Sequence, residues 1–440
     1  MKFYDRAAEL DTLRRIEADS HESARFVVLT GRRRVGKTEL LKRAFGKDGF
    51  LYFFVGRRSA AELCENYVQE ISDKLGMSLP ARFERIADVV KFVMELAKTR
   101  HITLVIDEFQ ELQRVEPGAF ADLQRDWDLL HDRIKLNLVV SGSIHRMMNK
   151  LFRDRHEPLY GRQTEFLKLM PFSLATLKEI LSDGKQNWMP EDLLSLYMIT
   201  GGVAKYVEVL MDNHAYDRNG MLDVVFRPES WFLEEGRVCL ADEFGRGYGI
   251  YFSILSSIAC GRTRRSEIEQ VIGGDLGTYI KNLVEDYALV QRNQPLFDKP
   301  KSRNIALKIS DNFFSFWFRF VAHYRYMLEI GANDRLKELV KRDYNVFSGQ
   351  MLERYFRQKF AESGEWTRIG SWWDRKGENE IDLIAENELD GRCAVCEVKR
   401  DKSRIDLDAL KAKFAMFADA SGGKWKRAKP DFLPLSLEDM

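Results

Sequence analysis

The segment at positions 31–38, Gly-Arg-Arg-Arg-Val-Gly-Lys-Thr, constrains the fold of this chain more than any other feature. It follows an apolar run at 26–30 that suits a buried strand, and it precedes a helical pattern at 39–45. Glycines at this spacing let the backbone turn tightly and aim its amides at phosphate oxygens, and the helix dipole adds positive potential. The motif therefore predicts an α/β fold with a nucleotide phosphate-binding loop made by Gly31, Arg34, Val35, Gly36, Lys37, Thr38 and Glu39. A chance match in a turn is the alternative, and the flanking strand and helix disfavour it.

Two side chains of this loop have expected roles toward a ligand. Lys37 is placed to reach the β- and γ-phosphates, and the hydroxyl of Thr38 is placed to ligate Mg2+. The segment thus predicts ATP, or a close relative, and Mg2+ as cofactors.

Polar residues at the ends of later strands could supply the chemistry. Asp107 and Glu108 end an apolar strand at 102–106; Asp107 could hold Mg2+ and Glu108 could act as general base toward water. An acidic pair that only caps a strand is the alternative. Ser141 ends the next strand and is expected to sense the γ-phosphate or the water, while Arg162 could stabilise the transition state, in cis or from a neighbouring subunit. The candidate catalytic residues are Glu108, Lys37, Arg162 and Ser141.

Strand and helix patterns divide the chain into five predicted regions. Strands at 26–30, 51–55, 102–106, 136–140 and 165–169 alternate with helices, which predicts a mostly parallel sheet covered on both faces. Beyond Pro171 the pattern becomes helical, and residues 250–309 follow the order of a winged helix-turn-helix, three helices and a hairpin. The predicted domains are an ATPase core at 1–173, a helical lid at 174–244, a winged helix at 245–310, connecting helices at 311–345 and a C-terminal α/β domain at 346–440.

Composition leaves the partner open. The 440 residues carry a formal net charge of +1, which argues neither for nor against nucleic acid. Five cysteines do not suggest a disulfide framework, and neither a signal peptide nor a long apolar stretch is visible. We therefore expect a cytoplasmic protein with no membrane partner.

The motifs resemble a known family when they are taken together. GRRRVGKTELL, LVIDEFQEL, VVSGSIHRMM, LYGR with LMPFS, and GGVAKYV follow each other in order over roughly residues 1–240. They resemble the archaeal-type P-loop ATPases of the STAND group, which are related to AAA+ and origin-recognition ATPases. The resemblance implies an ASCE-type sheet, in which the strand with the acidic pair lies beside the phosphate-loop strand. It also implies a small lid containing Gly201 and Gly202, often followed by a winged helix, and a preference for ATP.

The C-terminal region carries a second possible site. ISDNFFSFWFRFV resembles the entry to a domain often attached to these ATPases and classed with PD-(D/E)xK nucleases. Glu397 and Lys399 would share one face of a strand, and a hairpin could bring Asp382 beside them. Asp382 and Glu397 could then hold Mg2+ and Lys399 could activate water, while the resemblance places a further acidic residue at Glu353. The alternative is the charge alternation of a half-exposed strand.

The predicted winged helix gives a mixed signal for DNA. Basic residues occur before one helix and in the predicted wing, namely Arg262, Arg264, Arg265, Lys299, Lys301 and Arg303. The expected recognition helix at 276–286 instead sets Lys281 against Glu285 and Asp286, a poor face for reading DNA. We expect a Mg2+-dependent ATPase that acts on DNA. The alternative is a nucleotide-dependent signalling or scaffold switch that binds a partner protein or a second copy of the chain.

Overall fold

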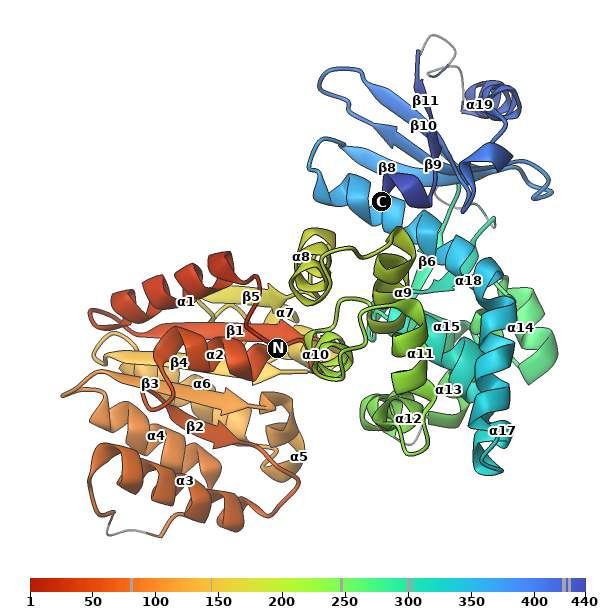
Figure 1. The fold of residues 1–440 in the computed structure, drawn as a ribbon. Helices are drawn as coiled ribbons and strands as arrows, with labels where there is room; N and C mark the ends of the chain where they lie inside the picture. The colour runs from red at the N-terminus through yellow and green to blue at the C-terminus, as the bar shows by residue number, and fades with distance from the viewer. Residues whose placement is uncertain are drawn as a thin grey trace. The chain divides into compact units, whose positions relative to one another are not determined.

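The computed structural model describes residues 1–79, 82–143, 145–245, 248–298, 302, 304–421, 425 and 429–440. The chain forms two compact units: Tyr4–Pro171 is one, and Met1–Phe3 with Phe172–Met440 is the other (Figure 1). Among the described residues, no helix combines the length and the apolar character needed to cross a membrane.

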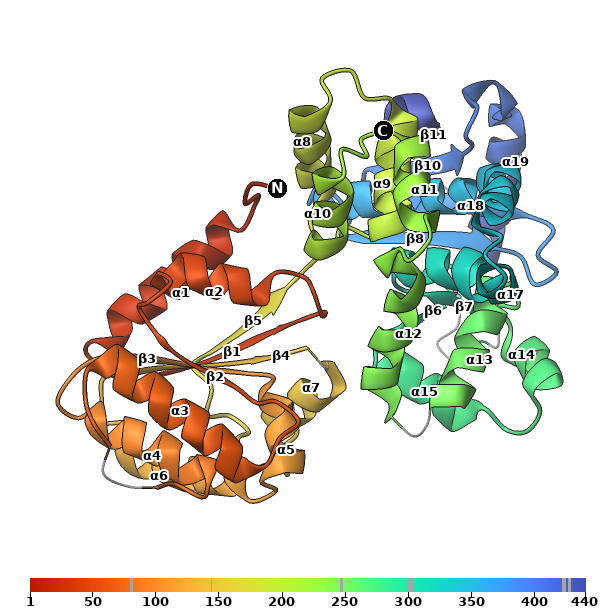
Figure 2. The same ribbon diagram turned by 60° about the horizontal axis from the view of Figure 1, so that its bottom comes forward.

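A five-stranded parallel sheet forms the centre of the unit Tyr4–Pro171, as the sequence predicts. Its order is β2-β3-β4-β1-β5, with β1 Arg25–Gly31, β2 Leu51–Phe54, β3 Ile102–Asp107, β4 Leu136–Gly142 and β5 Glu165–Leu169. The helices are α1 Ala7–Ser20, α2 Lys37–Phe45, α3 Ala60–Leu75, α4 Ile86–Leu96, α5 Leu112–Val115, α6 Ala119–Leu130 and α7 His145–Arg153, with a 3-10 turn, η1, at Phe109–Glu111. Helices α1 and α2 cover one face of the sheet, and α3, α4 and α6 cover the other (Figure 2).

One expectation about strand order is wrong. The strand with the acidic pair, β3, does not lie beside the phosphate-loop strand, because β4 separates it from β1. The chain runs from β1 to the edge strand β2 and then returns through β3 to β4, each time by a crossover connection. Strand β4 therefore occupies the position next to β1. The tip of β4 therefore lies between the loop and the acidic pair.

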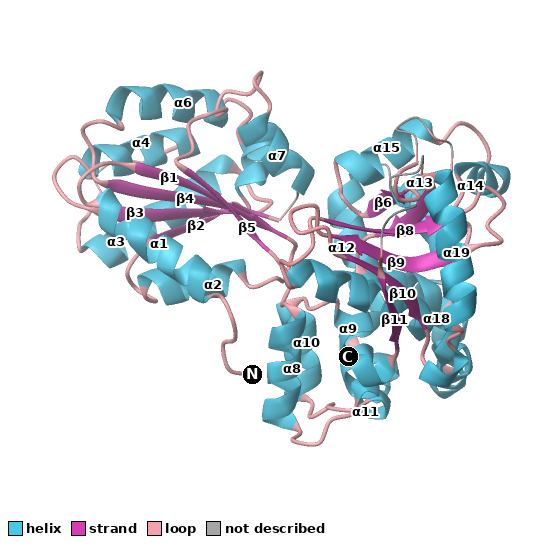
Figure 3. Ribbon diagram, turned by 90° about the horizontal axis from the view of Figure 1, so that it is seen from above, coloured by secondary structure: helices cyan, strands magenta, loops and turns pink. Residues whose placement is uncertain are grey.

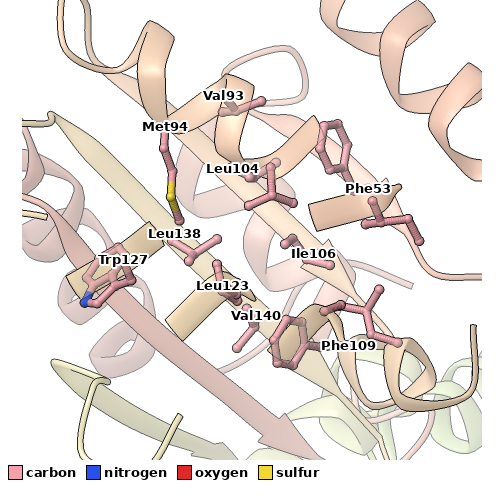
Figure 4. Close-up of a cluster of buried hydrophobic side chains, with 14 of the residues drawn as sticks. Phe53, Val93, Met94, Leu104, Ile106, Phe109, Leu123, Trp127, Leu138 and Val140 are labelled. Carbon is pink, nitrogen blue, oxygen red and sulfur yellow. The ribbon is translucent and has the colours of Figure 1, made fainter. Parts of the chain in front are cut away.

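An apolar core packs this sheet against α3, α4 and α6. Alternate residues of the strands point to this side, and they meet apolar side chains of the helices (Figure 4). The labelled members are Phe53, Val93, Met94, Leu104, Ile106, Phe109, Leu123, Trp127, Leu138 and Val140. The carboxyl ends of the strands are thus held at fixed positions relative to one another.

The second unit begins with helices and a hairpin in the predicted order. The helices are α8 Leu174–Gly184, α9 Pro190–Thr200, α10 Ala204–Asp212, α11 Arg218–Phe226, α12 Trp231–Phe244, α13 Tyr248–Ala259, α14 Arg265–Ile272 and α15 Gly277–Glu285. The chain breaks at Gly201 and Gly202, where φ is 58° and 74°. Strands β6 Val290–Asn293 and β7 Ala306–Ile309 pair antiparallel. The wing residues Lys299, Lys301 and Arg303 lie outside the described residues.

A long helix and a second sheet complete this unit. After α16 Asn312–Phe316, the π-helical η3 Trp317–Ala322 and α17 Arg325–Glu329, helix α18 runs unbroken from Asn333 to Glu362. It continues through residues 345 and 346, so the secondary structure has no break at that predicted boundary. The four-stranded sheet has the order β11-β10-β9-β8 and lies against α18 and α19 (Figure 3). Its elements are β8 Arg368–Trp373, β9 Glu380–Glu386, β10 Cys393–Val398, η4 Lys402–Arg404, α19 Leu407–Ala420, β11 Asp431–Leu435 and η6 Leu437–Asp439.

Helix α12 packs so closely against η3 that a side chain at Gly236 is expected to destabilise the fold. A Cβ added at Gly236 would lie 2.3 Å from the ring of Trp317, which is buried and donates its indole N–H to the Leu233 carbonyl. Gly236→Ala is expected to lower the free energy of unfolding by roughly 1–3 kcal/mol through overpacking. Gly349→Ala, in the middle of α18 with open space at the Cβ position, is expected to raise it by roughly 0.5–1 kcal/mol. Thermal unfolding of both variants would show shifts of opposite sign, and equal shifts would contradict this packing.

Candidate functional site

The loop between β1 and α2 folds around the ammonium group of Lys37. Gly36 has a φ of 103°, a conformation that a side chain would strain, and a Cβ at Gly31 would lie 2.7 Å from the Leu169 carbonyl oxygen. Lys37 is buried, and its Nζ donates to the carbonyl oxygens of Gly31 at 3.0 Å and Arg32 at 3.4 Å. The loop therefore turns tightly around a buried cation, which is the arrangement that phosphate binding requires.

Asp107 is the centre of a hydrogen-bond network at the carboxyl ends of β2, β3 and β4. Its carboxylate accepts from the hydroxyls of Tyr52 at 2.6 Å, Thr38 at 3.3 Å and Ser141, and from the Glu108 amide at 3.0 Å. Burial and the negative charge of Asp107 raise the pKa of Tyr52, so its hydroxyl remains a donor. The network fixes the Asp107 carboxylate next to the first turn of α2.

Glu108 turns away from β3 and is held by two other side chains. It has a φ of 51°, which is uncommon outside glycine. Ser143 Oγ donates to its carboxylate at 2.8 Å and 3.1 Å, and Gln110 Nε2 donates at 2.5 Å. Gly142 permits this approach, because a Cβ there would lie 2.5 Å from Gln110 Oε1. The carboxylate is thus oriented by side-chain hydrogen bonds without an ion pair among the described residues.

The predicted loop and catalytic residues do not all converge. Lys37, Thr38, Asp107 and Glu108 lie together, and Ser141 contacts Asp107, while Ser143 is the serine that reaches Glu108. Val35 is buried, Arg34 has a left-handed φ of 70°, and the exposed side chain of Glu39 accepts from Arg43 at 3.0 Å.

Arg162 is held outside this cluster. Its Nε and Nη2 donate to the Asp128 carboxylate at 2.9 Å and 2.8 Å, and Nη1 donates to the Pro158 and Tyr160 carbonyls. No contact with the loop or the acidic pair is present among the described residues.

The charged residues predicted in the C-terminal region do gather. The antiparallel register of β9 and β10 pairs Leu383 with Cys396, which sets Asp382 opposite Glu397. Asp382 accepts from the Val398 amide at 2.8 Å, and Lys399 Nζ lies 3.6 Å from Asp382 and 3.0 Å from Glu397. Lys413, which the sequence did not single out, lies 3.1 Å from Glu397.

Glu353 on α18 faces this group. Burial, followed by the charge of Asp382, raises the pKa of Glu353 to about 7, and burial also raises the pKa of Asp382. Across the described parts of the chain, no three His, Cys, Asp or Glu side chains are arranged to hold a metal ion. The predicted pair Asp382 and Glu397 is instead neutralised by lysines.

Comparison with known proteins assigns the family. A model described as an ATPase domain predominantly from Archaea matches residues 3–210. The protein MJECL04 of Methanocaldococcus jannaschii is 30% identical over 434 residues, which covers 92% of this chain and 90% of that protein. The chain belongs to this family of archaeal-type ATPases. A second model, for archaeal and bacterial proteins of unknown function, matches residues 317–410.

Two solved structures share the fold of this archaeal-type ATPase. The Walker-type ATPase paby2304 of Pyrococcus abyssi is 21% identical with a TM-score of 0.53, covering 72% of this chain and 96% of that one. The Aeropyrum pernix ORC2 protein is 14% identical with a TM-score of 0.50, covering 78% and 96%. Together with the family, they identify the protein as an ATPase built on a P-loop fold.

Three residues of the ATPase site carried little signal in the sequence. Tyr52 is the hydroxyl-bearing residue in an apolar strand, and a buried phenol usually needs a partner. Its partner could not be named without the pairing of β2 with β3, which sets Phe54 beside Asp107. Gln110 and Ser143 lie within motifs already noted. Gln110 contacts Glu108 from two residues along the same segment, whereas the contact of Ser143 with Glu108 depends on β4 lying next to β3.

Proposed function

We propose that this ATPase hydrolyses ATP with Mg2+ held at Thr38 and Asp107 and with Glu108 as the general base. The contact of 3.3 Å between the Thr38 hydroxyl and the Asp107 carboxylate carries the proposal, since both are oxygen ligands of the kind that Mg2+ takes. When bound, Mg2+ would neutralise charge on the phosphates. The ORC2 structure, which was determined as ADPNP–ADP complexes, supports ATP as the nucleotide.

Each residue of the site has a separate role in the proposed hydrolysis. Lys37 binds the β- and γ-phosphates in place of the loop carbonyls that it now contacts. Glu108 accepts a proton from the attacking water, with Ser143 and Gln110 keeping its carboxylate in position. Ser141 and Tyr52 orient Asp107. A charge-stabilising role for Arg162 would require release from Asp128.

Tyr52 gives a test of the proposed magnesium site. Loss of a hydrogen bond that orients a metal-binding carboxylate typically weakens metal affinity 10–100-fold, so Tyr52→Phe is expected to raise the Mg2+ concentration for half-maximal turnover by about tenfold. Tyr67→Phe is the matched control, because its hydroxyl donates to the Phe54 carbonyl instead. Identical Mg2+ dependence in both variants would rule out this role for Tyr52.

We further propose that the ATPase acts on DNA through a nuclease-like site at Glu353, Asp382, Glu397 and Lys399. The meeting of Asp382, Glu397 and Lys399 within 3.6 Å supports it. Mg2+ could replace the lysines on Asp382 and Glu397, and Lys399 would then orient water. The hairpin that follows α15 would contact the DNA backbone.

Plasmid cleavage tests this second proposal. Asp382→Asn is expected to lower the nicking rate by at least about 100-fold, since a metal ligand supplies several kcal/mol of transition-state stabilisation. Asp390→Asn, in the exposed turn between β9 and β10, should nick like wild type. An inactive wild type, or nicking that survives Asp382→Asn, would remove the nuclease assignment.

The charge pairing on two helices favours a second candidate function, a nucleotide-dependent signalling or scaffold switch. Arg265 pairs with Glu269 at 2.6 Å and with Asp275 at 2.7 Å, and Lys281 lies 3.8 Å from Glu285, so these helices offer little unpaired positive charge. In that case α13–α15 would pack against protein. A salt-dependent DNA shift assay with and without ATP separates the two candidates, because phosphate contacts weaken steeply with salt.

A further inference from the structure

A cavity of about 630 Å3 lies within the second unit, where the β6–β7 hairpin, α13 and η3 meet α18 and the start of β9. Its volume falls in the range of ligand sites, roughly 300–1,000 Å3. The charged residues of its wall include Lys308, Arg319, Arg354, Arg357, Glu353 and Glu380. Through Glu353 the cavity borders the proposed nuclease-like site.

Two of its arginines are already engaged in holding the fold together. Arg354 donates to the Ile309 carbonyl and to Asn312 Oδ1, both at 2.7 Å, and so ties the end of the hairpin to α18. Arg319 pairs with Asp343 at 3.1 Å. These residues shape the wall and keep few donors for a ligand.

Lys308 and Arg357 retain unused donors. Lys308 lies on β7 and lines the cavity together with its neighbours Leu307 and Ile309. The charges of Glu353 and Glu380 act on its ammonium group, but neither carboxylate forms an ion pair with it in the described part of the chain. Arg357 makes one long hydrogen bond, 3.4 Å, to the Asp382 carbonyl, and its buried Nε has no partner among the described residues. A buried donor without a partner is costly, which points to a ligand that accepts from it.

We infer that Lys308 and Arg357 bind a terminal phosphate of a single-stranded nucleic acid in this cavity, so that the hairpin forms part of the C-terminal site. A guanidinium and an ammonium group together suit the several acceptor oxygens of a phosphate. Glu353 and Glu380 line the same cavity, and their charges act on Lys308, so a phosphate competes with these two carboxylates for the ammonium group. The inference rests on the proposed action on nucleic acid, but it concerns binding and not cleavage.

Cys260 provides a readout that does not depend on any activity. It lines the same cavity and is half-buried, whereas the other four cysteines of the chain are buried. A ligand in the cavity should therefore slow its alkylation by a maleimide in the full-length protein. The probes are a short 5′-phosphorylated single-stranded oligonucleotide, the same oligonucleotide without the phosphate, and AMP.

We expect saturable protection of Cys260 by the phosphorylated oligonucleotide and much weaker protection by the other two probes. Lys308→Gln should weaken protection at least about tenfold, the scale of one charge-assisted hydrogen bond, and Lys308→Arg should retain it. Lys341→Gln, at an exposed position of α18, is the matched control, and thermal unfolding checks that each variant folds.

The outcomes separate this inference from the nuclease proposal. Equal protection by AMP would show that the cavity binds a free nucleotide, which contradicts the inferred nucleic-acid strand. Protection that is absent, or that is unchanged by Lys308→Gln, would overturn the inference even if DNA is cleaved. Protection that depends on Lys308 in a protein that does not cleave DNA would support the inference and remove only the nuclease assignment.

Discussion

Replacing Glu108 with glutamine is expected to stop ATP turnover while leaving ATP binding intact. An amide has the shape of the carboxylate and can still meet Ser143, but it cannot accept a proton from water. General-base catalysis typically contributes 10²–10⁴-fold, so kcat should fall by roughly that factor. Steady-state phosphate release measures the loss, and a fluorescent ATP analogue measures the retained affinity.

Glu111→Gln is the matched control for this change. Glu111 lies three residues further along on η1, and its carboxylate pairs with Arg57 at 3.8 Å and Arg114 at 3.4 Å, away from the Asp107 network. Its turnover should equal that of wild type. Wild-type turnover in Glu108→Gln would show that another group activates the water.

Replacing Lys37 with methionine is expected to abolish ATP binding itself. The substitution keeps the length of a side chain that is buried in the loop but removes the cation that would meet two phosphates. Hydrogen bonds to charged groups contribute about 1.5–3 kcal/mol each, so the affinity should fall by at least about 100-fold. Equilibrium binding of the fluorescent analogue gives the value directly.

Lys42→Met on the same helix, α2, controls for the loss of charge. Lys42 is exposed and lies beyond the first turn that follows the loop, so its affinity for ATP should match wild type. If Lys37→Met and Lys42→Met bind ATP equally well, the loop at 31–38 is not the phosphate site.

The arrangement of the ATPase unit follows from the sequence where local rules suffice. Apolar runs mark the strands β1 to β4, and β5 is predicted although it contains Glu165 and Lys168. The loop motif together with the acidic pair points to Thr38 and Asp107 at the same edge of the sheet. Strand order does not follow from these rules, because it depends on the path of each crossover. The place of β4, and with it the contact of Ser143 with Glu108, therefore required the structure.

In the second unit, too, contacts between distant parts of the chain could not be predicted from the sequence. The sequence indicates Asp382, Glu397 and Lys399 from the spacing of two strands, and their antiparallel pairing brings them together. Lys413 comes from α19 and Lys308 from a hairpin in a different predicted region, and no local pattern connects either to the site. The boundary predicted at 345/346 falls inside α18, although the buried residues Leu336, Val340, Tyr344, Phe347, Met351 and Tyr355 recur at helical spacing through that point.

A single-turnover experiment on wild type and Glu108→Gln tests the proposed hydrolytic site most directly. ATP is bound to each protein without Mg2+, and the reaction is started by adding Mg2+. We expect wild type to convert the bound ATP to ADP only after this addition and the variant to retain ATP unchanged. ADP formed before Mg2+ is added, or formed at the same rate in both proteins, would contradict the roles assigned to Thr38, Asp107 and Glu108.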